Sequence, residues 1–247
     1  MGFENHFGGV STGYARHRPA YPAALFPWLA SLPLHRHLAW DCATGTGQIA
    51  VPLAEHFTRV VATDGSAEQV AAAKAAKGVE YRIALAEASG LGAGSVDLVT
   101  VGQALHWFDL DAFWPEVRRV LRPGGAVCAL SYGVVRLGSP AADAVLAAFY
   151  RDVIAPLWPP ERRHVENGYA DLSFPFERVD APDLAMEVSW SAAELVDYMR
   201  TWSAGARLTE AEGEAPWTAI LGDLTKCWPD SGAERVYWPL KILAGRL

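Results

Sequence analysis

Short β-branched or apolar runs alternate with alanine-rich, helix-forming stretches between residues 38 and 132. This alternation is typical of βαβ units, in which parallel strands form a sheet and helices cover its two faces. It predicts five strands, at residues 38–42, 60–64, 79–83, 96–101 and 126–132. We therefore expect an α/β fold built on a parallel sheet.

Chemical signals mark the ends of the helices between these strands. Residues 66–69 begin with Ser and end with Gln, as in a capping box, and predict a helix that ends at about Lys77. Residues 111–121 predict a second helix, which the Arg-Pro-Gly-Gly sequence at 122–125 ends. Pro52 is expected to kink the helix after the first strand unless it lies in the first turn.

The rest of the chain has longer helical stretches with connections rich in Pro and Trp. Residues 191–194 form a second capping box and predict a helix through Tyr198 that extends as far as Trp202. Residues 235–247, with alternating Val, Trp and Leu, predict a final strand. Residues 14–29 hold three prolines among aromatic side chains, which predicts a broken helical segment that covers a pocket.

Composition and charge narrow the class of protein. The 247 residues are 51% hydrophobic and 20% charged, as in a globular protein. The net charge of −7, with both signs mixed, forms no basic stripe, so we expect no nucleic-acid partner. The three cysteines lie far apart, which indicates a reducing compartment and neither a disulfide framework nor a metal site. With no leader pattern and no apolar run of roughly eighteen residues, we expect a cytoplasmic protein without membrane attachment.

The segment from Asp41 to Gly47, Asp-Cys-Ala-Thr-Gly-Thr-Gly, follows the first strand and opens a helix. Glycine there permits a sharp turn and a close approach of a ligand to the backbone. Asp64 ends the second strand, where a carboxylate can accept both hydroxyls of a ribose. The alternative is an ordinary turn beside a solvated acid. The order of strand, loop, helix, strand and acid favours a nucleoside ligand.

Residues 45–50 also fit the Gly-x-Gly-x-x-Ala form of a dinucleotide fingerprint, so the glycine pattern alone does not choose the nucleoside. Asp41 would repel a pyrophosphate at the helix N-terminus, but it could hold the ammonium group of a methionine moiety. This favours S-adenosylmethionine over NAD. The absence of a Walker-type lysine disfavours a nucleoside triphosphate.

His106 and Trp107 lie in the segment that follows the fourth strand. Loops at the carboxyl ends of parallel strands form the ligand crevice, so both side chains are candidate catalytic residues. The Trp107 face can attract a sulfonium or stack on a planar substrate, and His106 can act as a base or donate a hydrogen bond. The alternative is a structural His beside a core Trp.

The sequence resembles the class I methyltransferases of the type 11 domain, particularly the group similar to trans-aconitate methyltransferase. The resemblance covers roughly the first 135 residues and runs through six segments, at residues 14–22, 41–47, 64, 86–87, 103–109 and 122–125. Ala43 replaces the first glycine of the family's loop, and Leu85 replaces an acid that is frequent at the adenine site.

The resemblance implies S-adenosylmethionine as the cofactor and assigns a role to each matching residue. Asp41, Ala43 and Gly45 would hold the methionine part and Asp64 the ribose. Ala86 would lie at the adenine edge with Glu87 beside it, and the Gln103 backbone would hold the amino-acid end. Tyr14 and Arg18 are expected near the methionine end, in a segment that closes over the donor. The cofactor-binding residues expected are thus Tyr14, Arg18, Asp41, Ala43, Gly45, Asp64, Ala86, Glu87 and Gln103.

The expected fold is a doubly wound, Rossmann-like, mostly parallel sheet of seven strands with an antiparallel last strand and a C-terminal helical lid. Residues 1–37 would form a cap segment, 38–135 the S-adenosylmethionine-binding core, and 136–247 the lid and the completion of the sheet. The expected reaction is methyl transfer without a metal to a small molecule, with a carboxylic acid among the candidate acceptors. The alternatives are a catalytically silent binding module and an NAD-linked reductase.

Overall fold

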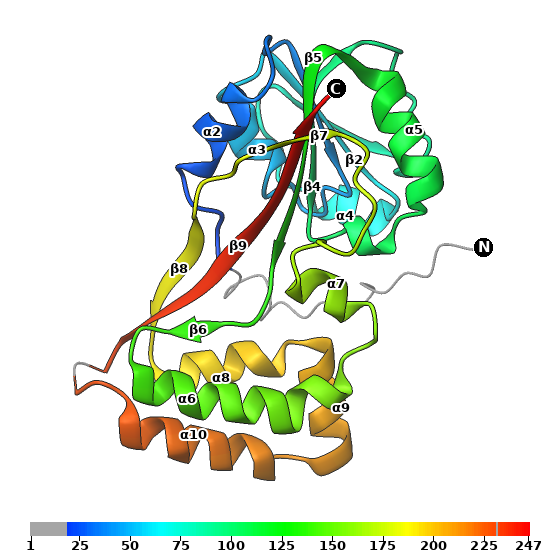
Figure 1. The fold of residues 1–247 in the computed structure, drawn as a ribbon. Coiled ribbons are helices and arrows are strands. Elements are labelled where there is room, and N and C mark those ends of the chain that lie inside the picture. Colours follow the sequence, from blue (N-terminus) through cyan, green and yellow to red (C-terminus); the bar gives the residue numbers. More distant parts are fainter. Residues whose placement is uncertain (1–18, 231) are drawn as a thin grey trace.

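The computed structural model describes residues 19–230 and 232–247, and its centre is a twisted sheet (Figure 1). Five strands run parallel in the order β3-β2-β1-β4-β5, and β9 then pairs antiparallel with β5. The bounds are β1 Leu38–Cys42, β2 Arg59–Asp64, β3 Val79–Ile83, β4 Val96–Gly102, β5 Leu121–Tyr132 and β9 Glu234–Arg246. All five predicted parallel strands and the antiparallel last strand are therefore confirmed.

The sheet of the described residues has nine strands, so the expected number of seven was wrong. Three short strands, β6 Arg136–Leu137, β7 Glu177–Val179 and β8 Ala185–Trp190, pair antiparallel with β9. β9 has 13 residues, longer than the core strands need, and pairs with β5 through residues 240–246. Its first half extends beyond the core and pairs with β6 and β8.

Helices cover both faces of the parallel strands. On one face, α2 Leu25–Ser31 and α3 Ala50–Leu53 bury apolar side chains against Ala39, Val60 and Leu98. On the other face, α5 Leu110–Val120 packs Phe113 and Val117 against alternate residues of the same strands. Because both faces are buried, β4 is apolar or buried along nearly its whole length, as expected for a parallel sheet.

The helix after β2 confirms its predicted start but not its predicted end. The Ser66 hydroxyl accepts the Gln69 N–H at 3.3 Å and caps α4, which spans Ala67–Ala72 instead of reaching Lys77. Ala73 is extended, and the Lys74 N–H donates to the Thr46 carbonyl at 3.2 Å. This tertiary hydrogen bond to the glycine loop replaces the helical one, so α4 ends early.

Pro52 lies in the first turn of α3, where its missing N–H costs no helical hydrogen bond. α5 ends at Val120 as predicted within a residue, and β5 follows directly. The predicted capping box at Ser191 and Glu194 is confirmed, since each side chain bonds the other residue's backbone N–H. The helix that it opens, α8, spans Ala192–Arg200.

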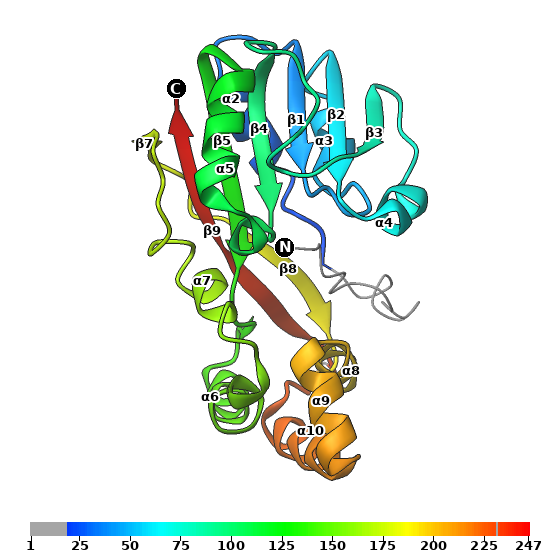
Figure 2. The same cartoon turned by 90° about the vertical axis from the view of Figure 1, so that its right-hand side faces the viewer.

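The C-terminal helices form a separate layer beyond the sheet (Figure 1). Figure 2 shows that β1 and β4 point their carboxyl ends toward this layer. Its helices are α6 Pro140–Phe149, α8, α9 Ser203–Glu212 and α10 Ala215–Cys227. After α6 come the short helical turns η2 Tyr150–Ile154 and η3 Ala155–Leu157 and the short helix α7 Arg162–Glu166, whereas η1 Leu105–Trp107 lies in the core between β4 and α5. Within the described ranges, no helix has the length and apolar character needed to cross a membrane.

Candidate active site

Asp41 lies at the carboxyl end of β1 and is only 1% exposed. Its carboxylate accepts hydrogen bonds from the hydroxyls of Thr44 at 2.5 Å and Thr100 at 2.8 Å. Burial raises the pKa of Asp41 to about 6, and the two threonine hydroxyls oppose this rise. The carboxylate therefore links the glycine loop to β4 by hydrogen bonds, and burying its charge costs free energy.

The glycine loop turns through three left-handed backbone positions, Ala43 at φ 54°, Gly45 at φ 56° and Gly47 at φ 90°. A Cβ on Gly47 would lie 2.2 Å from the Tyr81 hydroxyl, so only glycine fits there. Ala43 occupies a conformation that costs a residue with a Cβ about 1 kcal/mol or more. The substitution of Ala for the expected first glycine is thus tolerated, with strain.

Asp64 lies at the end of β2 and is half-buried. One carboxylate oxygen accepts the Gly45 N–H at 2.8 Å, and the other accepts the Ser66 N–H at 2.9 Å. An ionised carboxylate has about four acceptor positions, so both oxygens can accept further hydrogen bonds. Asp64 and the glycine loop, predicted to share a site, do lie in contact.

The residues expected around an adenine lie after β3. Ala86 is buried, and the Glu87 carboxylate accepts the Asp109 N–H at 3.1 Å, at the N-terminus of α5. Ile83 and Leu85 are large apolar side chains exposed to 61% and 52%. Exposed apolar groups of this size at the ligand edge of a sheet can cover a planar base.

Gln103 follows β4 in a left-handed conformation, with φ 57°. Its side-chain amide donates to the Tyr132 carbonyl and accepts the Tyr132 N–H, both at 3.0 Å, at the end of β5. Its own N–H donates to the Leu130 carbonyl at 2.8 Å. The side chain is therefore fixed between two strand ends, and a ligand would contact the backbone of this turn.

His106 and Trp107 lie in η1, at the carboxyl end of β4, with ring centroids 4.6 Å apart. The His106 Nδ1 lies 3.3 Å from the hydroxyl of Tyr169, a fully buried residue with φ 63°. Burial lowers the pKa of His106 to about 4, and the charges of Arg162 and His164 add to this effect. His106 is therefore a neutral imidazole near pH 7.

Two predicted residues, Tyr14 and Arg18, lie outside the described residues. The described part of the same segment places Tyr21 beside β4, because a Cβ on Gly102 would lie 3.1 Å from the Tyr21 hydroxyl.

Thr44 and Thr100, the partners of Asp41, had no separate signal in the sequence analysis. Tyr169 was also missed, because it follows β4 by many residues and lies in no recognisable motif.

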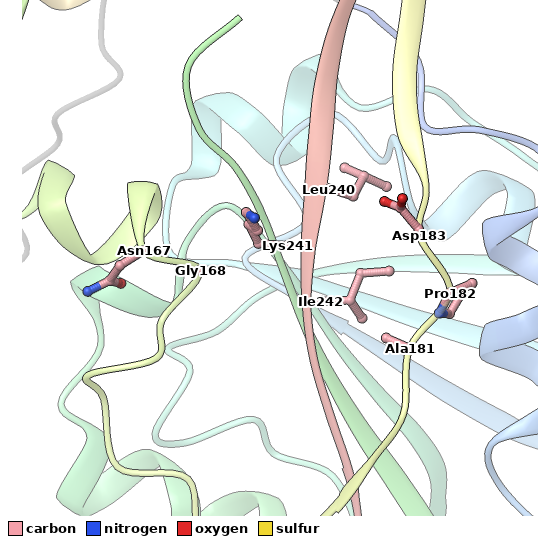
Figure 3. A pocket seen from close by; sticks show the side chains of 8 residues that line it. All are labelled: Asn167, Gly168, Ala181, Pro182, Asp183, Leu240, Lys241 and Ile242. Carbon is pink, nitrogen blue, oxygen red and sulfur yellow. The ribbon is translucent and has the colours of Figure 1, made fainter. Parts of the chain in front are cut away.

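Described residues line two surface cavities. One, of about 320 Å³, borders the glycine loop and is lined by Thr46, Gly47, Gln48, Val51, Pro52, Ala72 and Lys74. The other, of about 330 Å³, lies beside β9, with Lys241 and Ile242 on opposite sides of the strand (Figure 3). The cavity beside β9 contains none of the predicted site residues.

Ala43→Gly is expected to stabilise the protein by up to about 1 kcal/mol. Glycine removes the strain of the left-handed backbone, and this gain exceeds the loss caused by the greater conformational entropy of glycine in the unfolded chain. Urea unfolding measures the change. Ala71→Gly is the matched control: it lies at an exposed position in α4, where the same substitution should destabilise by about 1 kcal/mol. Equal destabilisation by both variants would contradict a strained Ala43.

Asp41→Asn is expected to stabilise the folded protein at pH 8 by on the order of 1 to 3 kcal/mol. The folded pKa of Asp41, about 6, lies above the ordinary value of 3.8, so the ionised acid reduces stability above pH 6. As pH falls from 6 toward 4, the wild-type acid is protonated and the advantage of Asn shrinks. Either threonine hydroxyl can accept a hydrogen bond from the Asn amide.

Denaturant unfolding at pH 8 and pH 5 tests this sign. Asp97→Asn is the control, because the equally buried Asp97 is paired with Arg122 and accepts the N–H groups of His37 and Leu38. Removing the charge of Asp97 should lower the free energy of unfolding at pH 8. An Asp41→Asn protein less stable than wild type at pH 8 would show that the buried charge is not costly.

Comparisons with known proteins agree with this geometry. A family model described as a methyltransferase domain matches residues 40–129. A Dictyostelium discoideum protein named as a methyltransferase is 34% identical over 229 residues, which cover 92% of this chain and 87% of that protein. An uncharacterized methyltransferase of Mycobacterium tuberculosis H37Rv is 41% identical over 122 residues, 48% of this chain and 49% of that one.

A solved structure from Anaeromyxobacter dehalogenans, described as a type II methyltransferase, is 43% identical. It superposes with a TM-score of 0.87 and covers 93% of this chain and 97% of its own. This coverage means that the match includes the helical layer as well as the sheet. The chain therefore belongs to the class I methyltransferases, and its cofactor is S-adenosylmethionine.

Proposed function

We propose that this enzyme methylates a small molecule at a carboxylate oxygen. The observation that carries the proposal is the neutral His106, whose pKa is lowered to about 4. A base this weak removes a proton poorly from a phenol, an alcohol or an ammonium group near pH 7. A carboxylate is already ionised and needs no proton removed, so this acceptor class suits the site.

S-adenosylmethionine, when bound, supplies an electrophilic methyl group on a sulfonium. The residues at the carboxyl ends of β1 to β4 suit this molecule. Asp64 retains acceptor capacity for the two ribose hydroxyls, and exposed Ile83 and Leu85 offer apolar surface to the base beside Ala86. Leu85, in place of an acid, leaves the adenine contact to packing and backbone groups.

The methionine end of the donor would lie against the glycine loop and the Gln103 backbone. Asp41 contributes negative potential there, although its oxygens are bonded to Thr44 and Thr100. We propose that it acts on the donor's ammonium group through this field or after the Thr44 hydroxyl turns away.

His106 would then position the acceptor rather than deprotonate it. A neutral imidazole can donate one hydrogen bond, and the adjacent Trp107 is 38% exposed and can pack on an acceptor. Much of the rate would come from holding the carboxylate oxygen in line with the sulfonium methyl group. The site's own residues thus bind, orient and exclude water.

Asp64→Ala is expected to weaken donor binding at least roughly tenfold, because hydrogen bonds to a charged group contribute about 1.5 to 3 kcal/mol. Calorimetric titration with S-adenosylmethionine measures the change, and unfolding curves confirm that the variant is folded. Asp64→Asn, which keeps one acceptor oxygen, should lose less affinity. An unchanged affinity in folded Asp64→Ala would place the donor elsewhere.

His106→Ala and His106→Gln are expected to raise the acceptor KM and to leave kcat within about threefold of wild type. Steady-state kinetics with a labelled methyl donor, on the best acceptor from a screen of small acids, amines and phenols, provide both constants. His35→Ala, at an exposed His beyond the site, should change neither. A fall in kcat on the order of 10² to 10⁴ would instead identify His106 as a general base.

A further inference from the structure

The short helix α7 lies across the end of β5, next to the proposed acceptor side of the crevice. The Ser131 hydroxyl donates to the Val165 carbonyl at 3.2 Å, and a Cβ on Gly133 would lie 3.5 Å from the Glu166 backbone. The chain then turns so that the Tyr169 hydroxyl reaches His106. The C-terminal end of α7 is thus fixed against the end of β5, and the residues just beyond it reach η1.

Arg162 lies in the first turn of α7, and neighbouring side chains hold its guanidinium group in position. Its guanidinium carbon lies 4.5 Å from the centre of the Trp158 ring, and its side chain is only 19% exposed. Nε lies 3.4 Å from a Glu166 carboxylate oxygen, which also accepts the hydrogen bond of the Tyr150 hydroxyl. The guanidinium is therefore oriented by stacking and by a long contact to a carboxylate.

Two basic residues of α7 lie near enough to His106 to act on it electrostatically. Arg162 and His164, both on α7, act on the imidazole, and Arg162 also acts on the Tyr169 hydroxyl. His164 is paired with Asp171 at 2.8 Å, and Glu166, 37% exposed, lies nearer to solvent than Arg162. Among the residues that the structure describes, the buried Trp158 indole N–H beside Arg162 has no hydrogen-bond partner.

We propose that Arg162, stacked on Trp158 at the start of the helix that contacts the end of β5, binds a carboxylate of the methyl acceptor and selects anionic acceptors. This inference rests on the proposed function and names the group that gives it specificity. A guanidinium remains charged at all working pH values and presents two N–H groups to a carboxylate in one plane. Neutral His106 adds a hydrogen-bond donor without adding a charge.

Calorimetric titration of the wild-type complex with S-adenosylhomocysteine tests the proposal with four probes: benzoate, succinate, tricarballylate and the neutral match succinamide. At least one carboxylate should bind, and succinamide should bind roughly tenfold more weakly or worse. Arg162→Gln should weaken carboxylate binding roughly tenfold or more, and Arg162→Lys should weaken it less. S-adenosylhomocysteine should bind all variants equally.

Arg163→Gln is the matched control, because Arg163 carries the same charge on the same helix and is exposed. It should bind every probe within about twofold of wild type. NMR titration of the imidazole adds a readout that needs no acceptor: the pKa of His106 should rise in Arg162→Gln and stay low in Arg163→Gln.

Three results would overturn the assignment of Arg162. They are no carboxylate binding to a wild-type protein that binds S-adenosylhomocysteine, equal binding of succinamide and succinate, and unchanged carboxylate affinity in Arg162→Gln. Each leaves the methyltransferase function intact. Failure of the wild-type protein to bind S-adenosylhomocysteine would instead remove the donor site, and with it both the proposed function and the role of Arg162.

Discussion

The buried carboxylate of Asp41 is the interaction on which the arrangement of the site depends. It joins β1 to β4 through Thr100 and fixes the start of the glycine loop through Thr44. The loop then reaches β2, where the Thr44 N–H bonds the Thr63 carbonyl and the Gly45 N–H bonds Asp64. Three neighbouring strand ends are thereby held in one register, although burying the ionised acid costs stability.

The same edge of the sheet separates opposite charges. Asp41 and Asp64 lie at the ends of β1 and β2, whereas Arg162 lies on α7 near the end of β5. His106, at the end of β4 between them, is neutral. In the proposed reaction, a cationic donor would face the acids and an anionic acceptor the arginine. This separation of charge would align the two reactants before methyl transfer. Attraction between unlike charges is stronger in a closed crevice, where water is excluded.

Strands β1, β2, β4 and β5 could be predicted because most of their residues are buried, which requires apolar runs in the sequence. The edge strand β3 is only partly buried, and its prediction depended on the alternation of strands and helices. Asp64 could be placed beside the glycine loop because a parallel sheet brings consecutive strand ends together. The end of α4 could not be predicted, because the hydrogen bond from the Lys74 N–H to the Thr46 carbonyl forms only when the glycine loop is folded. Arg162 and Tyr169 escaped prediction for a similar reason: their neighbourhood with His106 arises from the helical layer, which carries no local motif.

A crystal structure of the complex with S-adenosylhomocysteine tests the central claim most directly. The account predicts the ribose hydroxyls within hydrogen-bonding distance of the Asp64 carboxylate, the homocysteine end against the glycine loop and Gln103, and the sulfur directed toward His106. A ligand bound away from Asp64, for example in the cavity beside Lys241 (Figure 3), would contradict it.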